Sequence, residues 1–291
     1  MADLLSANVT ATVERWLAEG AKLYDYGMND FADPRVGNWL FMSRPHETIA
    51  LTLAYYFIVF AGKRVMQDRK PFDLKPLVVI YNAAMVALSA YMLHEFVMTA
   101  WNAGYDLVCQ PVDYSNSENG LRMASVVWWY YFSKFIEFLD TFFMVLRKKN
   151  EQITFLHVYH HGSMFCLWWM GTKWVPGGQA FFGASINCFV HVIMYAYYML
   201  SAMGISVWWK KYITVLQLVQ FVIAWIHAIG SLYVDCNFPH WMHYGLMIYL
   251  FTLILLFLNF YIHSYGQKGK SNKSARGQGT KPASRKSAKT E

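Results

Sequence analysis

The stretch Thr48-Ile-Ala-Leu-Thr-Leu-Ala-Tyr-Tyr-Phe-Ile-Val-Phe60 carries no charged side chain, and its flanks extend the apolar run to about 47–62. A helix needs about 20 such residues to cross the hydrocarbon core of a bilayer, which is about 30 Å thick. Six more apolar runs follow, at about 76–101, 122–146, 153–171, 179–203, 212–234 and 241–263. The sequence therefore predicts an all-α integral membrane protein with seven transmembrane helices.

The composition supports this prediction and excludes other classes. Of the 291 residues, 56% are hydrophobic and 15% are charged, whereas soluble domains carry about 25% charged residues. These values exclude a disordered chain, a coiled coil and a disulfide scaffold. The net charge of +7 does not indicate a nucleic-acid partner, because the basic residues lie between and after the apolar runs. The composition therefore predicts that membrane lipid surrounds the protein.

The chain divides into three parts. Residues 1–45 form a mixed polar and aromatic arm, whose first residues lack the basic-then-apolar pattern of a cleaved signal peptide. Residues 46–263 hold the seven spans. Residues 264–291 are rich in Lys, Ser and Gly, and we expect this basic tail to be disordered because it cannot bury a core.

The loops predict the orientation of the spans. Lys and Arg gather in the segments 63–75, 147–149 and 210–211 and in the tail, which the positive-inside rule places in the cytosol. The N-terminus is then lumenal, and Asn8-Val-Thr10 is a glycosylation sequon on the lumenal side. Cys109 and Cys236 fall in lumenal loops, where the oxidising environment permits a disulfide between them.

Ionisable and amide side chains inside the spans gather in four groups with helical spacing. Such residues are costly at membrane depth and are functional-site hypotheses by default. Each group lies on one helix face, and the connecting loops place all four in one layer toward the cytosolic side. The lumenal halves of the same spans are mainly apolar and aromatic. The groups are Lys134, Glu137 and Asp140; His157, His160 and His161; Asn187 and His191 with Tyr195 and Tyr198; and Gln217 with Gln220.

Structural roles compete with this hypothesis. Lys134 can form an ion pair that ties helices together, and Gln217 and Gln220 can join helices by hydrogen bonds. Cys166 and Cys188 fall inside spans, where a cysteine usually acts as a small apolar residue. The separate histidines at 94, 227, 240, 243 and 263 are expected to be structural.

Metal binding is a second alternative, because His-x-x-His-His also occurs in di-iron membrane desaturases and hydroxylases. Such a site needs about eight histidines on one membrane face, whereas the other close pair, His240 and His243, falls at the lumenal end. A single zinc would need one further ligand, and we expect no metal. A seven-span receptor does not require such a polar layer, and a transporter usually shows internal repeats, which this sequence lacks.

Four motifs resemble those of the very-long-chain fatty acid elongases, the ELOVL family. They occur in the family's order, and the resemblance extends from about residue 33 to residue 261. Three further segments, 68–72, 113–116 and 258–261, resemble the vertebrate subgroup that acts on very-long-chain and polyunsaturated acyl chains. The tail departs from that subgroup, because Lys289 stands without the second lysine of a dilysine retrieval signal. The motifs are Lys134-Phe-Ile-Glu-Phe-Leu-Asp-Thr141, Gln152-Ile-Thr-Phe-Leu-His-Val-Tyr-His-His161, Asn187-Cys-Phe-Val-His-Val-Ile-Met-Tyr195 and Thr214-Val-Leu-Gln-Leu-Val-Gln-Phe221.

The resemblance implies a fold and an activity. The fold has seven helices, six of which enclose a narrow acyl tunnel. The activity condenses acyl-CoA with malonyl-CoA to 3-oxoacyl-CoA, CO₂ and CoA, without a cofactor, in the endoplasmic-reticulum membrane. The expected partners are the 3-oxoacyl-CoA reductase, the dehydratase and the enoyl reductase of the fatty acid elongation cycle. Other elongase subunits are expected as partners in an oligomer.

The resemblance also implies roles for residues. His160 is the expected acyl carrier, with Cys166 or Cys188 as the alternative, and His161, His191 and Asn187 are expected to stabilise the enolate or oxyanion. Asp140 and Glu137 would orient an imidazole, as a carboxylate does in a triad. Tyr195, Tyr198, Gln217 and Gln220 would contact substrate, and Lys148, Lys149, Lys210 and Lys211 would bind the CoA phosphates. The lumenal half of the tunnel would be lined from among Gly183, Ala184, Ala224, Ile229 and Gly230.

Overall fold

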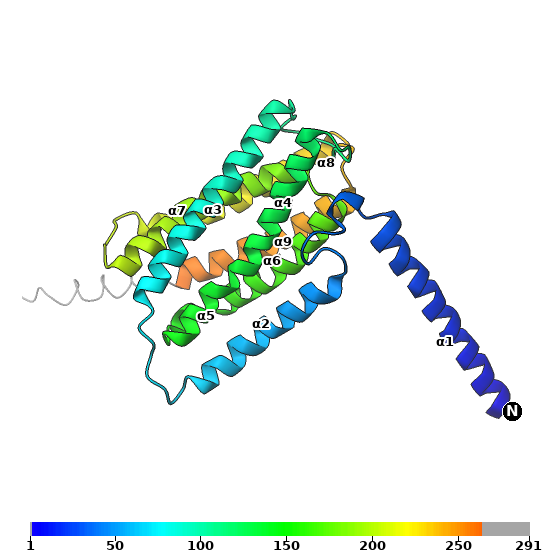
Figure 1. Cartoon of the computed structure of the whole chain (residues 1–291), viewed down its shortest axis with the longest axis horizontal. Helices are drawn as coiled ribbons and strands as arrows, with labels where there is room; N and C mark the ends of the chain where they lie inside the picture. The colour runs from blue at the N-terminus through cyan, green and yellow to red at the C-terminus, as the bar shows by residue number, and fades with distance from the viewer. Residues whose placement is uncertain (1, 264–291) are drawn as a thin grey trace, which may run out of the picture.

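The structure is a computed structural model that describes the backbone of residues 2–263 and, apart from Lys211, the side chains of residues 10–263. All the regular elements within the described range are helices (Figure 1). The predicted disorder of the tail, residues 264–291, lies outside the described residues. In chain order the helices are α1 (Ala2–Asp25), η1 (Tyr26–Asp30), η2 (Pro34–Val36), α2 (Pro45–Val65), α3 (Lys75–Asn102), α4 (Glu118–Ile136), α5 (Phe138–Leu146), η3 (Asn150–Gln152), α6 (Phe155–Trp174), α7 (Ala180–Met203), α8 (Lys210–Tyr233) and α9 (His240–Tyr261).

Five of the described helices are long and apolar enough to cross a membrane: α2, α3, α7, α8 and α9. The chain is therefore a multi-pass membrane protein. The other two predicted spans, which correspond to α4–α5 and α6, carry the ionisable residues described above, so composition alone does not select them. Their helices nevertheless run through the same bundle (Figure 1).

The prediction of one continuous helix over residues 122–146 is wrong. The structure ends α4 at Ile136 and starts α5 at Phe138, with Glu137 between them. The amide of Glu137 still donates to the Ser133 carbonyl, but the amide of Asp140 donates only three residues back, to the carbonyl of Glu137 itself. This tighter turn places the break at the buried carboxylate.

Six helices form a closed ring. Following the contacts between neighbours, α3 packs on α4, α4 on α6, α6 on α9, α9 on α8, α8 on α7, and α7 on α3. Helix α2 stands outside this ring and packs against α5 and α6 (Figure 1). Segments distant in sequence, such as α3 and α7, thus lie side by side, which is what encloses the interior.

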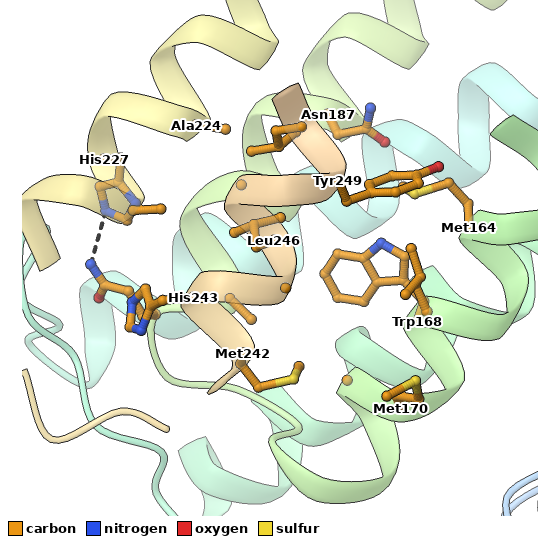
Figure 2. A pocket seen from close by; sticks show the side chains of 18 of the residues that line it. Met164, Trp168, Met170, Asn187, Ala224, His227, Met242, His243, Leu246 and Tyr249 are labelled. Atoms are coloured by element: carbon orange, nitrogen blue, oxygen red, sulfur yellow. Dashed lines mark hydrogen bonds between the residues drawn. The ribbon is translucent and has the colours of Figure 1, made fainter. Parts of the chain in front are cut away.

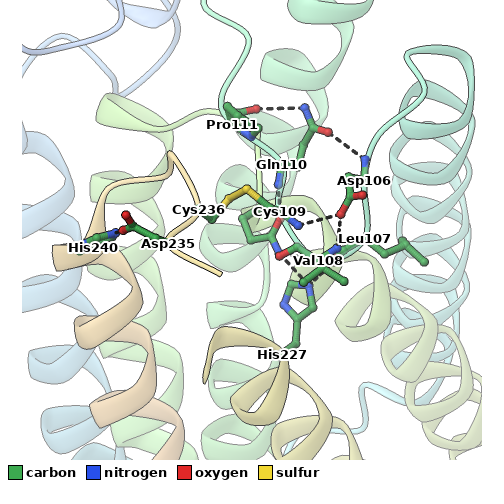
Figure 3. Close-up of a disulfide and its surroundings, with 11 residues drawn as sticks. Asp106, Leu107, Val108, Cys109, Gln110, Pro111, His227, Asp235, Cys236 and His240 are labelled. Atoms are coloured by element: carbon green, nitrogen blue, oxygen red, sulfur yellow. Dashed lines mark hydrogen bonds and ion pairs between the residues drawn. A yellow bond between two sulfur atoms is a disulfide. The ribbon is translucent and has the colours of Figure 1, made fainter. Parts of the chain in front are cut away.

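The ring has two distinct ends. The end that we call the basic end holds the connections α2–α3, α5–α6 and α7–α8, which carry the Lys and Arg residues of segments 63–75, 147–149 and 210–211. The opposite end, the disulfide end, holds the bond between Cys109 and Cys236 (Figure 3). Beside it, the amides of Val108 and Cys109 donate to the Asp106 carboxylate, and these hydrogen bonds hold the pKa of Asp106 below its usual value.

The N-terminal arm is mostly helical, which the sequence analysis did not predict. Helix α1 leaves the bundle at the disulfide end and runs away from it (Figure 1). Its apolar residues, among them Trp16, Leu17 and Leu23, are exposed. Asn8 lies in this helix, but its side chain is outside the described residues.

Candidate active site

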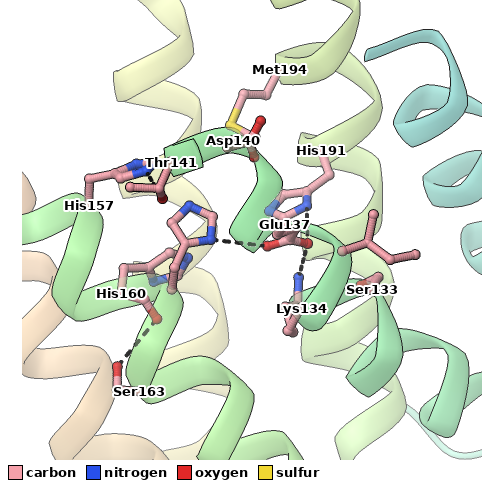
Figure 4. A network of polar contacts seen from close by, with 12 residues as sticks. Ser133, Lys134, Glu137, Asp140, Thr141, His157, His160, Ser163, His191 and Met194 are labelled. Carbon is pink, nitrogen blue, oxygen red and sulfur yellow. Dashed lines mark hydrogen bonds and ion pairs between the residues drawn. The ribbon is translucent and has the colours of Figure 1, made fainter. Parts of the chain in front are cut away.

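A buried carboxylate, Glu137, is the centre of the polar layer (Figure 4). Its side chain is 1% exposed and accepts a hydrogen bond from Lys134 Nζ at 2.7 Å. Two imidazoles approach the same carboxylate: His191 Nδ1 lies 3.4 Å from Oε1 and His161 Nδ1 lies 3.7 Å from Oε2. Side chains from α4, α6 and α7 therefore contact the same carboxylate, which agrees with the single polar layer expected from the sequence.

Asn187 extends this cluster toward the interior of the ring. Its Oδ1 atom accepts a hydrogen bond of 2.5 Å from the Tyr130 hydroxyl and lies 3.5 Å from Lys134 Nζ. The ammonium group also lies 4.3 Å from the centre of the Tyr130 ring, a cation–π contact. Tyr130 was not predicted as a site residue, although it lies one helical turn before Lys134 and its spacing could have indicated the shared face.

Asp140 and Thr141 hold a second set of contacts. The Tyr195 hydroxyl donates to Asp140 at 2.7 Å, and Thr141 Oγ1 lies 2.9 Å from His157 Nε2. Tyr55 of α2 adds a hydroxyl at 3.0 Å from Thr141. Glu137, rather than Asp140, is therefore the carboxylate that approaches imidazoles. Thr141 contacts His157, the first of the three histidines in the segment 157–161, which we call the histidine box.

His161 Nδ1 is buried without a hydrogen bond but lies 3.7 Å from the Glu137 carboxylate. His160 has no such charged partner among the described residues. Its Nδ1 atom is buried and has no hydrogen-bond partner among the described residues. The ring centre lies 5.4 Å from that of His161, which in turn lies 4.4 Å from that of His157. A neutral imidazole with an unengaged nitrogen beside a lysine–glutamate pair can act as a nucleophile or as a base.

The remaining predicted residues are more scattered. Gln217 Nε2 lies 3.4 Å from the sulfur of Met194, whereas Gln220 is buried with Oε1 unpartnered among the described atoms. Tyr198 is exposed, although its ring touches that of Tyr195.

The four lysines proposed for CoA also differ from one another. Lys148 donates to the carbonyls of Gln67 and Arg69, so it ties the α5–α6 connection to the α2–α3 connection. Lys149 and Lys210 are exposed at the basic end. The side chain of Lys211 lies outside the described residues.

An apolar cavity of about 220 Å³ opens beside the cluster, inside the ring (Figure 2). Asn187, Gln220 and Tyr130 line it on the side of the polar layer. Its walls are apolar and aromatic, and its far end reaches toward the disulfide end. The wall residues include Met164, Trp168, Phe221, Leu246, Tyr249 and Leu250.

The structure separates the five residues predicted for the tunnel wall. Gly183 and Ala224 line the cavity. Ala184 is fully buried in the core between α3, α4 and α7, Ile229 is 39% exposed, and neither they nor Gly230 line the cavity. Ala184 is therefore excluded as a lining residue, because its side of α7 faces the packed core.

Among the described residues, no group of three or more His, Cys, Asp or Glu side chains has the geometry to hold a metal ion. His240 and His243 lie at the disulfide end, in the first turn of α9, far from the histidine box. Cys188 is buried and Cys166 half-buried, and both are free thiols.

This combination defines a class: a multi-pass membrane protein whose helices surround an imidazole-rich site and an apolar cavity. Residues 40–273 match the model of the ELO family, described as GNS1/SUR4. The chain belongs to this family.

Three curated relatives share about half of their residues with it. Very long chain fatty acid elongase 4 of Macaca mulatta is 51% identical over 84% of this chain and 80% of its own length. Elongase 2 of Mus musculus is 45% identical over 86% of this chain and 89% of its own length. Elongase 5 of Tachysurus fulvidraco is 47% identical over 83% of each chain.

Proposed function

We propose that this protein is a very-long-chain fatty acid elongase that condenses an acyl-CoA with malonyl-CoA. The observation that carries the proposal is the position of the Glu137 cluster, with its imidazoles and Lys134, beside an apolar cavity that Tyr130 and Asn187 of the same cluster line. Family membership and the names of the relatives support the same activity.

His160 carries the acyl group in this proposal. Its nitrogen attacks the thioester carbon, CoA leaves with the imidazole proton, and an acyl-imidazole remains. Burial excludes water that would hydrolyse this intermediate. The unpartnered Nδ1 atom and the neighbouring His161 support the assignment.

Malonyl-CoA then binds and loses CO₂. The resulting enolate attacks the acyl carbon, the bond to His160 breaks, and a proton returns to the imidazole. Lys134, His191 and Asn187 surround the place where negative charge develops, and preorganised donors of this kind stabilise an enolate or an oxyanion. Glu137 positions these donors, and no cofactor is required.

The acyl chain occupies the apolar cavity, and the CoA groups lie at the basic end, where Lys149 and Lys210 are exposed. The acyl class includes polyunsaturated chains, a proposal that rests on the subgroup motifs in the sequence. Gln220 lines the cavity near the cluster and is placed to contact the substrate.

The membrane arrangement follows the same logic. We assign seven spans, counting α4–α5 and α6 as two of them because α4 and α6 complete the ring with the apolar helices α3, α7, α8 and α9. The basic end faces the cytosol by the positive-inside rule, so that Asn8 is lumenal and open to glycosylation. The endoplasmic reticulum is the proposed membrane. The proposed partners are the reductase, dehydratase and enoyl reductase of the fatty acid elongation cycle, together with other elongase copies in an oligomer.

Release of labelled CO₂ from malonyl-CoA tests the proposal. Purified protein with acyl-CoAs of several lengths should release CO₂ and form the 3-oxoacyl-CoA with two more carbons, seen by mass spectrometry. Neither event should occur without acyl-CoA. Absence of both products from folded protein would contradict the assignment, and iron-dependent desaturation would point to the alternative class.

A further inference from the structure

The far end of the apolar cavity is polar, unlike its walls. Three side chains line this end: Gln179 and His227, which are hydrogen-bonded to each other at 2.9 Å, and His243 (Figure 2). They come from the chain before α7, the last turns of α8 and the first turn of α9, all of which lie at the disulfide end. The terminal carbon of an acyl chain bound at His160 would reach these three side chains.

Two of the three side chains have hydrogen-bond partners in the protein. His227 Nε2 lies 2.7 Å from the carbonyl of Leu107, and Gln179 Nε2 donates to the carbonyl of Val108 at 2.6 Å (Figure 3). The His227 ring also stacks on Phe182 at 3.9 Å. These contacts attach the far end of the cavity to the loop that carries Cys109.

His243 is the exception. It is 2% exposed, and both ring nitrogens are buried without a hydrogen-bond partner among the described residues. The carbonyl of Pro239, one turn earlier, is close to the ring but makes no hydrogen bond of normal geometry with it. The imidazole meets the Phe238 ring edge to face, with ring centres 4.9 Å apart and an angle of 75° between the planes. A buried polar side chain without partners is unusual in a folded protein and indicates a ligand that completes it.

The chemistry of His243 defines the ligand. A neutral imidazole offers one N–H donor and one acceptor nitrogen. A hydroxyl group complements it, since a hydroxyl can donate and accept at once, whereas a methyl end can do neither. Among the residues that the structure describes, no charged side chain lines this cavity, so a neutral group fits better than a carboxylate.

We propose that His243 forms a hydroxyl-binding subsite at the far end of the acyl cavity and that it recognises ω-hydroxylated acyl chains. Bound water is the other source of the same hydroxyl chemistry, and the experiment below separates the two. The inference rests on the proposed elongase function and adds a substrate class to it.

The length of the cavity sets which chains reach the subsite. Gln179 and His191 are twelve residues apart along the start of α7, which corresponds to about 18 Å at 1.5 Å per residue. Two carbons of an extended chain span about 2.5 Å, so a straight chain of about 14 carbons covers this distance. A bent acyl chain needs more carbons to reach His243, so the substrate series should run from about 12 to 20 carbons.

The experiment compares kcat/KM for ω-hydroxyacyl-CoA and plain acyl-CoA of equal length across this series. A purely apolar pocket penalises an added hydroxyl by about 100-fold. The wild-type protein should show a penalty below about tenfold at the lengths that reach His243, and a larger one for shorter chains. His243→Phe should restore the penalty to about 100-fold, and His243→Gln should recover part of the tolerance.

His240→Phe is the matched control. His240 lies in the same turn but is exposed, faces Asp235 at 3.3 Å and does not line the cavity. Its replacement should leave the ratio of the two substrates unchanged.

Three outcomes would be decisive. A penalty of about 100-fold in the wild-type protein at every length would overturn the subsite and assign water to His243. Equal tolerance in the wild-type and His243→Phe proteins would also overturn it. If the wild-type protein fails to elongate even plain acyl-CoAs, the proposed function fails instead. Should His243→Phe not fold, the length dependence of the wild-type ratio decides alone.

Discussion

The two halves of the helical ring differ in what their interior contains. Toward the basic end, the Glu137 carboxylate has Lys134, His161 and His191 within 4 Å. Toward the disulfide end, the interior is a cavity with apolar walls. The polar cluster is suited to catalysis, and the cavity is suited to limiting the length of the acyl chain. Substitutions in the cluster should therefore lower the reaction rate, whereas substitutions in the cavity should change which chain lengths are accepted.

The largest effect should come from His160→Ala. Loss of the proposed acyl carrier should lower condensation by at least about 10³-fold, as loss of a nucleophile does in other enzymes. Intact-mass measurement after incubation with acyl-CoA alone should show one added acyl group in the wild-type protein and none in the variant. If the adduct persists in His160→Ala but is lost in Cys166→Ala, the acyl carrier is the thiol.

The ion pair of Lys134 and Glu137 comes next. Lys134→Met should destabilise the protein by about 3–5 kcal/mol, because it leaves a buried carboxylate without its partner. Adding Glu137→Leu should return much of the stability but not the activity, which separates a structural from a functional role. Thermal unfolding in detergent and CO₂ release measure the two.

Lys148→Met is the control for the ion pair, since this lysine bonds only to carbonyls at the partly exposed basic end. It should cost about 1 kcal/mol. Equal losses of stability in Lys134→Met and Lys148→Met would mean that the buried pair has no special role.

The disulfide should matter less for chemistry than for stability. Replacing Cys109 and Cys236 by Ala removes a link between residues 127 apart in sequence, and on the chain-entropy model the loss is about 5 kcal/mol, which strain in the native bond would reduce. Short acyl-CoAs should still be elongated at low temperature. Peptide mapping without reduction should recover the two peptides joined, and alkylation of both thiols in native protein would contradict the bond.

The smallest effect on total activity, and the most selective, should follow from bulk in the cavity. Ala224→Trp should reduce elongation of the longest acyl-CoAs by at least about tenfold, or about 1.4 kcal/mol, with little change for short ones. Ile229→Trp is the control, since Ile229 lies on the same helix but outside the cavity. A product spectrum of Ala224→Trp identical to that of the wild-type protein would show that the cavity does not set chain length.

The site was predictable where its geometry is local. The spacing of Lys134 with Glu137, and of His157 with His160 and His161, places each group on one helix face whatever the rest of the fold does. The span directions, taken from the basic loops, then predicted a common depth for these groups. The structure brings Glu137, His161 and His191 together as this layer implies.

What failed depends on how helices rotate against one another. Ala184 and Gly183 are neighbours in sequence, yet Gly183 faces the cavity and Ala184 faces the core. Sequence periodicity gives the angle between two residues of a helix but not the absolute direction of either, because packing against other helices sets it. The break at Glu137 was not predicted, and Tyr130 was not named as a site residue although its spacing from Lys134 places it on the same helix face.

The sequence by itself determined that this chain crosses a membrane with apolar helices, and that its imidazoles and carboxylates share a layer, because hydropathy and helical periodicity are properties of short segments. Only the tertiary structure decided the closed order of six helices, the choice of Glu137 as the shared carboxylate, and the unpartnered His243 at the end of the cavity. Each of these depends on contacts between residues far apart along the chain. Their free energies are settled by packing of the whole ring rather than by any one segment.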